Sequence, residues 1–239
     1  PDLPALVQCA SDVRSLSYAL VAQGVASGQL TRMISSLNDQ LVSRLLDVTA
    51  PRHDLSGATL CWIGMGSEGR SEQTIATDQD NGLIFVANDP AAAPDSIRDR
   101  LLPFAREVNE GLDALGYPLC KGGVMAMNPK WCASLDEWRA AFYAWIDRGD
   151  PQSLLEANIF FDFRALWGEA AIAEVLRVDI AGRARGNPRF LKQMSDNALT
   201  VRPPLNWLGE IATKQDDRGV AGIDLKASGT AAFVDGARI

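Results

Sequence analysis

The sequence predicts an α+β fold, in which a small β-sheet lies between an N-terminal helical hairpin and a C-terminal helical region. Three observations predict this class: helical spacing of apolar residues near the N-terminus, short apolar runs bounded by glycine in the middle, and helical spacing again in the second half. We expect three parts, with an N-terminal helical segment over residues 1–52, a core over 53–130 and a helical region over 131–239.

The N-terminal part is expected to form two helices, because apolar residues recur at helical spacing over residues 3–20 and again over 30–46. Gly24 marks the expected end of the first helix. One apolar face on each helix is typical of core or interdomain packing. That face could cover the chain's own sheet, an upstream module or a second copy, so a homodimer stays open. Since the chain starts at Pro1 instead of methionine, we expect a piece of a longer protein.

The middle of the chain is expected to contain short buried strands. Residues 58–63 and 82–87 are apolar runs that begin after or at glycines, and residues 123–127 are a third candidate. The stretch between the first two runs has room for a turn and about two helical turns at most. A helix is expected over residues 95–115, where Pro103 should kink it or delay its start.

Helical spacing predominates beyond residue 131. Ser134 and Glu137 match the S-x-x-E capping box, which predicts that a helix starts there. Further helices are expected over residues 154–167, 170–183 and 190–199.

Composition limits the classes of function. A net charge of −7 offers no basic surface for bulk nucleic acid, and no apolar run approaches the roughly 20 residues of a membrane span. The cysteines form no C-x-x-C pair, which indicates reduced thiols in a cytoplasmic protein. His53 is the only histidine, so multi-histidine metal sites are excluded and a Ser-His-Asp triad would need this residue.

Three glycines after the first apolar run, Gly64, Gly66 and Gly69, fit the G-x-G-x-x-G spacing of dinucleotide-binding proteins. That unit needs a crossover helix of at least about 10 residues between two parallel strands. Only the eight residues "RSEQTIAT" separate Gly69 from Asp78, and they show no amphipathic stripe. An oxidoreductase is therefore disfavoured. The segment "DQDNG" also begins like an EF-hand, but its glycine is fifth instead of sixth.

Asp78 and Asp80 suggest a different chemistry. Two carboxylates at positions i and i+2 of a strand point to the same side, while Gln79 points away, so the pair could hold divalent metal ions. Gly66 and Ser67 allow a tight turn whose N–H groups and hydroxyl face phosphate oxygens. The alternative is a solvated acidic turn without chemistry.

A larger set of residues in this segment resembles the G-[GS]-x-G-R-x-E…[ST]-D-x-D signature of the nucleotidyltransferase superfamily: Gly66, Ser67, Gly69, Arg70, Glu72, Thr77, Asp78 and Asp80. The resemblance is to the branch of the PII-protein uridylyltransferases. It is closer to a group of bacterial nucleotidyltransferases often found downstream of cyclic-nucleotide-binding and CBS modules. The stretches "TDQDNGLIF" and "KGGVMAMNPKW" are typical of that group.

The resemblance implies a mixed-sheet nucleotidyltransferase core that moves a uridylyl or adenylyl group from a nucleoside triphosphate to a protein or small-molecule acceptor. It also implies two Mg²⁺ ions and a role in signal transduction as the output of upstream regulatory modules. It assigns roles to six residues: Asp78 and Asp80 as catalytic metal ligands, Gly66 and Ser67 as triphosphate contacts, and Arg70 and Glu72 as residues that orient the loop or the phosphates.

One departure concerns the third carboxylate that many members of the superfamily place on a later strand. The stretch "GGVMAMN" contains none. Asp150, Glu156 or Asp162 could substitute, although Asp162 could equally form a local structural pair with Arg164. The alternative to an enzyme is a nucleotide-binding signalling module that has lost the group that activates the acceptor.

Overall fold

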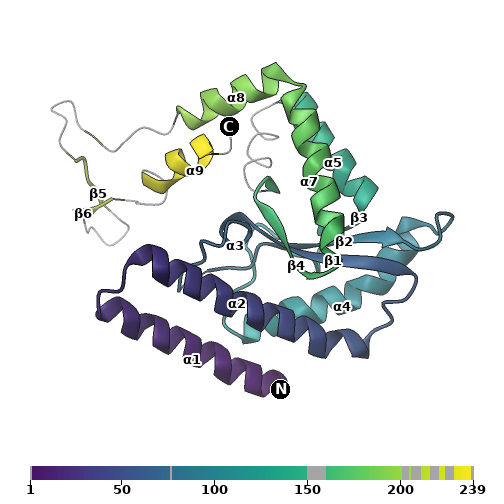
Figure 1. The fold of residues 1–239 in the computed structure, drawn as a ribbon, viewed down its shortest axis with the longest axis horizontal. Helices are drawn as coiled ribbons and strands as arrows, with labels where there is room; N and C mark the ends of the chain where they lie inside the picture. The colour runs from purple at the N-terminus through teal and green to yellow at the C-terminus, as the bar shows by residue number, and fades with distance from the viewer. Residues whose placement is uncertain are drawn as a thin grey trace. The chain divides into compact units, whose positions relative to one another are not determined.

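The computed structural model describes residues 2–75, 77–149, 160–200, 205, 211–215, 221–223 and 229–237. Internal contacts divide the chain into two units. The first is Pro1–Ala141 with Ile159–Asp179, and the second is Phe142–Asn158 with Ile180–Ile239. Helices precede and follow a small mixed sheet, so the α+β class is confirmed (Figure 1).

The sheet has four strands in the order β3-β2-β1-β4. They are β1 (Ala58–Met65), β2 (Asn81–Ala87), β3 (Cys132–Ser134) and β4 (Phe163–Gly168). The central strand β1 is antiparallel to β2 and to β4, whereas β2 and β3 are parallel. Because a dinucleotide-binding unit requires its first two strands to be parallel, the antiparallel pairing of β1 with β2 excludes that interpretation of the glycines.

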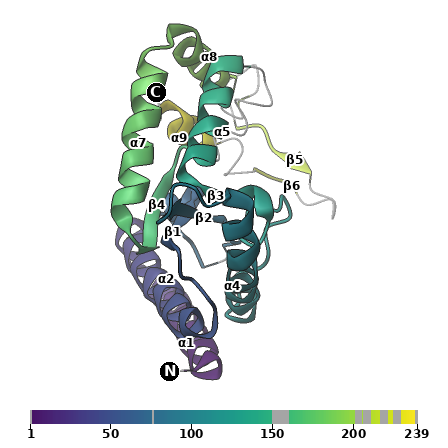
Figure 2. The same cartoon turned by 90° about the vertical axis from the view of Figure 1, so that its right-hand side faces the viewer.

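Two long helices, α2 (Ser27–Thr49) and α4 (Pro94–Ala114), pack on one face of the sheet, and a third, α1 (Leu3–Ala22), packs on α2. Figures 1 and 2 both show them on the same side of the strands. The hairpin predicted at the N-terminus is confirmed, and Gly24 adopts the positive φ of +73° that ends a helix without strain. The hairpin covers the chain's own sheet, because leucines of α1 and α2 share one hydrophobic core with Trp62 and Phe85.

The remaining described elements are α3 (Gly66–Gly69), α5 (Leu135–Arg148), α7 (Ala170–Arg185), α8 (Pro188–Ala198), α9 (Ala231–Ala237), the 3-10 turns η1 (Ala50–Arg52) and η2 (Pro129–Trp131), and the short strands β5 (Lys214–Gln215) and β6 (Ala221–Gly222). The Ser134–Glu137 capping box is confirmed. The Glu137 carboxylate accepts hydrogen bonds from the backbone N–H and the hydroxyl of Ser134, both at 2.8 Å. In return, the Ser134 hydroxyl accepts from the Glu137 N–H at 3.2 Å.

Two expected elements were wrong. Residues 123–127 form turns instead of a strand, because Gly123 has φ of +68° and short-range backbone hydrogen bonds close the chain on itself. The expected helix over 154–167 is interrupted by β4, whose residues pair with the free edge of β1. The part of that helix over 154–159 lies outside the described residues.

Pro103 lies inside α4, which begins at Pro94, so the proline does not delay the start of the helix. The four cysteines are free thiols, as expected. Among the helices that the structure describes, none combines the length and the apolar character that crossing a bilayer requires.

Candidate functional site

Asp78 and Asp80 lie in the segment that immediately precedes β2. Their expected position on the strand itself was wrong, because β2 begins at Asn81. Burial nevertheless alternates along this segment: Gln79 and Asn81 are buried, Asp78 is exposed and Asp80 is partly exposed. In an extended chain such alternation places Asp78 and Asp80 on the same, accessible side. The two carboxylates therefore lie on one side of the segment, as they would on a strand, although the segment itself does not pair as a strand.

The Gly-Ser turn lies directly beside Asp80. Gly66 is the first residue of α3 and has φ of +57°. A Cβ atom added to Gly66 would lie 3.4 Å from Oδ2 of Asp80, which is contact distance, so the carboxylate lies directly against the glycine. The N–H of Met65 donates to the carbonyl of Asp80 at 2.8 Å, which ties the end of β1 to the aspartate segment. Within the part of the chain that the structure describes, the Ser67 hydroxyl makes no hydrogen bond.

Arg70 connects the turn to the segment before β4. Its Nε donates to Glu72 at 2.7 Å, and its Nη1 donates to the Asp162 carboxylate at 2.6 Å. The guanidinium remains one quarter exposed. Asp162 also contributes its backbone carbonyl, which accepts from the Gly66 N–H at 2.9 Å. Gly69 permits this contact, because a Cβ there would lie 2.1 Å from the same carbonyl oxygen.

The local pair of Asp162 with Arg164 does not form. Arg164 instead forks onto Asp39 of α2, with Nη1 and Nη2 at 2.8 and 2.7 Å from the two carboxylate oxygens. The Asp162 carboxylate is held by Arg70. Of the three residues considered as a third carboxylate, Asp162 thus lies near the turn, whereas Asp150 and Glu156 lie outside the described residues.

Glu68 is a residue of this site whose environment the sequence did not reveal. Its side chain is buried and accepts from Nε2 of Gln73 at 3.2 Å. It occupies space that a side chain at Gly64 would fill, since a Cβ there would lie 2.6 Å from Cγ of Glu68. Burial, with the negative charges of Asp39 and Asp80, raises the pKa of the Glu68 carboxyl to about 8. No local pattern in the sequence indicated this burial.

Cys120 is a second residue that the sequence did not single out. Its thiol hydrogen bonds to the Asp80 carboxylate. Burial raises the pKa of this thiol, and the negative charge of Asp80 raises it further. Because a thiol is a weak donor, Cys120 adds only a weak contact to Asp80.

The donor chemistry of the two aspartates suits a hard divalent cation. Mg²⁺ prefers carboxylate oxygens and is commonly held by one or two carboxylates, with substrate phosphates and water completing its coordination. Among the described residues, no group of three or more His, Cys, Asp or Glu side chains is arranged to hold a metal ion. Asp78 and Asp80 could therefore hold metal only together with ligands from substrate and water.

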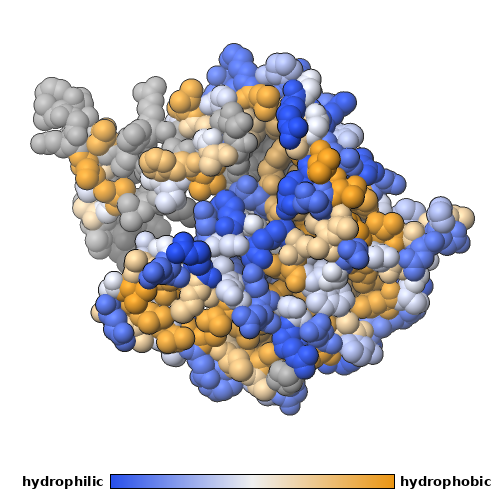
Figure 3. Space-filling view, viewed as in Figure 1, coloured by the Kyte–Doolittle hydropathy of each residue, from blue (hydrophilic) through white to orange (hydrophobic). Residues whose placement is uncertain are grey.

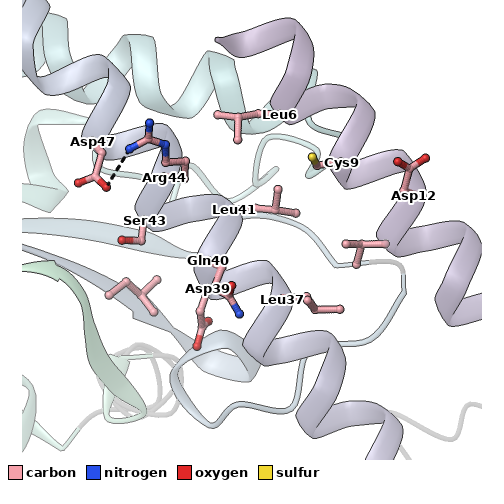
Figure 4. A pocket seen from close by; sticks show the side chains of 12 residues that line it. Leu6, Cys9, Asp12, Leu37, Asp39, Gln40, Leu41, Ser43, Arg44 and Asp47 are labelled. Carbon is pink, nitrogen blue, oxygen red and sulfur yellow. Dashed lines mark ion pairs between the residues drawn. The ribbon is translucent and has the colours of Figure 1, made fainter. Parts of the chain in front are cut away.

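A surface groove of about 810 Å³ lies over the exposed face of α2, between α1 and β4 (Figure 4). Leu6, Leu37 and Leu166 contribute apolar surface, and Asp39 and Asp47 are among its polar residues. Neither Asp78 nor Asp80 lines this groove. Its volume lies in the range of small-molecule sites, but the residue types that phosphoryl chemistry needs are gathered at the Gly-Ser turn instead.

An antiparallel β-hairpin that brings a Gly-Ser turn against an Asp-x-Asp segment defines a nucleotidyltransferase-like core. Comparison with protein families agrees. The family described as "Putative nucleotidyltransferase DUF294" matches residues 11–152, and "Putative nucleotidyltransferase substrate binding domain" matches residues 188–239. The first match covers more than half of the chain, so the chain belongs to this nucleotidyltransferase family, a family of transferases. Among curated proteins, none matches the chain.

Proposed function

We propose that the protein transfers a nucleoside monophosphate, uridylyl or adenylyl, from a nucleoside triphosphate to a protein or small-molecule acceptor. The acceptor's hydroxyl oxygen forms a bond to the α-phosphorus and gives up its proton to water, and the bond to the pyrophosphate oxygen breaks. The observation that carries the proposal is the Asp80 carboxylate beside Gly66, with Asp78 on the same accessible side of the segment. Anion-binding and cation-binding groups are thus adjacent, as a metal-bound triphosphate requires.

The residues take the following roles in this proposal. Asp78 and Asp80 would hold two Mg²⁺ ions, which when bound neutralise the triphosphate and polarise the α-phosphorus. The Ser67 hydroxyl, which has no partner among the described residues, is available to donate to a phosphate oxygen. Arg70, held by Glu72 and Asp162, fixes the loop and keeps a partly exposed guanidinium near the turn.

We further propose a regulatory role in the cytoplasm, in which upstream modules control the transfer. The support is the resemblance to nucleotidyltransferases that follow cyclic-nucleotide-binding and CBS modules. Four free cysteines also suit a reducing compartment.

Calorimetry with ATP, UTP, GTP and CTP, each with and without Mg²⁺, tests the metal site. We expect Mg²⁺ to strengthen binding of at least one nucleotide. Asp78→Asn or Asp80→Asn should reduce this gain in affinity by a factor of at least about 10, since each loses a charged ligand. Asp113→Asn removes an equal charge from an exposed position of α4 and should bind as the wild type does. Equal binding by the wild type and both site variants would contradict the metal role.

The second candidate is a nucleotide-binding signalling module without transfer activity. The observation that favours it is the engagement of the Asp162 carboxylate by Arg70 at 2.6 Å, which occupies the one candidate third carboxylate that the described residues include. Pyrophosphate release in the presence of cellular proteins and small hydroxyl compounds separates the two. Mg²⁺-dependent binding without release across the acceptors favours the module, whereas release that requires Asp80 identifies the enzyme.

A further inference from the structure

The residues that alternate with the two aspartates form a buried polar network. Gln79 and Asn81 are 3% and 1% exposed. Both reach Asn109 of α4, which is fully buried. The side chains that point inward from the Asp-x-Asp segment are therefore polar, although they lie against a largely apolar core. A buried polar group that lacks a partner destabilises the fold, so the network is stable only when its bonds are complete.

Asn109 uses its whole side-chain amide. Its Nδ2 donates to Oε1 of Gln79 at 2.8 Å and to Oδ1 of Asn81 at 2.9 Å. Its Oδ1 accepts from the N–H of Met127 at 2.8 Å. Its backbone carbonyl accepts from Nε2 of Gln79 at 3.0 Å. Asn109 thereby holds both neighbours of Asp80, which are Gln79 and Asn81, and Gln79 is also the neighbour of Asp78.

The turns between α4 and β3 hold the same two residues from another direction. The backbone N–H groups of Gln79 and Asn81 donate to the carbonyls of Pro118 at 3.1 Å and Val124 at 3.2 Å. The Ala126 N–H donates to Oδ1 of Asn81 at 2.9 Å. These turns replace the strand expected over residues 123–127. The turns form single backbone hydrogen bonds with the aspartate segment, whereas a strand would form a regular series of them.

We propose that Asn109 is a positioning residue for the metal-binding carboxylates: it fixes Gln79 and Asn81 and thereby sets the directions of Asp78 and Asp80. The inference rests on the proposed function. Neither aspartate contacts Asn109 in any hydrogen bond described above, so the effect passes through the backbone of the segment. Metal ligation and phosphoryl transfer depend on such positioning, because a shift of about 1 Å in a reacting group costs on the order of 100-fold in rate.

The test measures the gain in nucleotide affinity that Mg²⁺ gives, as the ratio of the dissociation constants in EDTA and in Mg²⁺. The probe is whichever of ATP, UTP, GTP and CTP the wild type binds most tightly. Asn109→Leu fills similar space without donors or acceptors, and Asn109→Ser removes the amide but leaves room for water. We expect both variants to lose at least about tenfold of the gain while circular dichroism and cooperative unfolding show that they are folded.

Val108→Ala is the matched control. Val108 is the preceding residue of α4, is fully buried and belongs to the hydrophobic core. Its truncation lowers stability without touching the network, so the variant should keep the wild-type gain. This control separates positioning from general destabilisation. If Asn109 only stabilised the fold, its variants would keep the Mg²⁺-dependent gain as Val108→Ala does, provided that the loss of stability is equal.

The outcomes are distinguishable from those of the proposed function. If the wild type shows no gain with Mg²⁺, the proposed function itself fails. If the wild type shows the gain, Asp78→Asn loses it and both Asn109 variants keep it, only the positioning role is contradicted. Either Asn109 variant alone decides the question if the other does not fold.

Discussion

Glu68 directs its carboxyl into the protein from a turn whose neighbouring residues are partly exposed. The absence of a side chain at Gly64 provides the space, and Gln73 provides a hydrogen bond. Arg164 lies close enough to lower the pKa of this carboxyl, but burial and the charges of Asp39 and Asp80 raise it by more. The carboxyl is therefore protonated in the folded protein at neutral pH, whereas its ordinary value of 4.5 makes it ionised in the unfolded chain.

This difference predicts a stability that falls as pH rises. Because the folded-state pKa of Glu68 is raised to about 8, its contribution is fully present below pH 4.5 and is lost as pH rises towards 8. The loss is on the order of 4 kcal/mol. Glu68→Gln should remove it, since an amide does not ionise. Urea unfolding at pH 5 and pH 8.5 in EDTA measures the effect, with the exposed Glu110→Gln as the control. A wild type and a Glu68→Gln variant with the same pH dependence would refute the assignment.

At the level of single residues, sequence reasoning reached those side chains whose types and spacing carry chemistry. The Gly-Ser turn and the Asp-x-Asp segment are close in sequence, so their joint placement needed only a short connection. Asp162 is far from the turn in sequence, but its backbone carbonyl accepts a hydrogen bond from the Gly66 N–H. Cys120 meets Asp80 in the same long-range way. No local pattern encodes such contacts, which depend on how β4 and the turns before β3 pack.

Among the elements, helix starts and central strands were predictable because their signals are local. The capping box at Ser134 and Glu137 specified the start of α5 through hydrogen bonds over three residues. The sequence of β4, "FRALWG", has no clear alternation, and its strand conformation depends on the free edge of β1. Residues 123–127 are apolar enough for a strand, but Gly123 at φ of +68° turns the chain there.

The capping box gives a prediction at this scale. Ser134→Ala should lower the free energy of unfolding by about 1 kcal/mol, because the N–H of Glu137 loses its acceptor at the start of α5. Urea unfolding measures this difference. Ser36→Ala, at an exposed position within α2, should change stability by less than about 0.5 kcal/mol. An equal effect of the two substitutions would mean that the cap contributes nothing.

At the scale of the whole molecule, the N-terminal hairpin and the sheet share one hydrophobic core. Leu45 and Leu46 of α2 lie in the same core as Trp62 of β1 and Phe104 of α4. The boundary expected after residue 52 therefore stays a prediction about sequence organisation, while the core of the first unit extends across it. The outer side of α1 is different: Leu16 and Val21 are 47% and 50% exposed, and hydrophobic surface is visible in the region of the hairpin (Figure 3).

A shared core predicts shared unfolding. Leu46 has no exposed surface, so Leu46→Ala should cost about 2–5 kcal/mol, whereas Leu16→Ala on the exposed side of α1 should cost much less. Native-state hydrogen exchange followed by mass spectrometry measures the free energy at which the amides of each element open. Amides of α2 and of β1 should exchange with the same free energy, and Leu46→Ala should lower both by equal amounts, because opening the hairpin exposes the sheet. If α2 opened at a lower free energy and Leu46→Ala left β1 unchanged, the hairpin would be a separate folding unit.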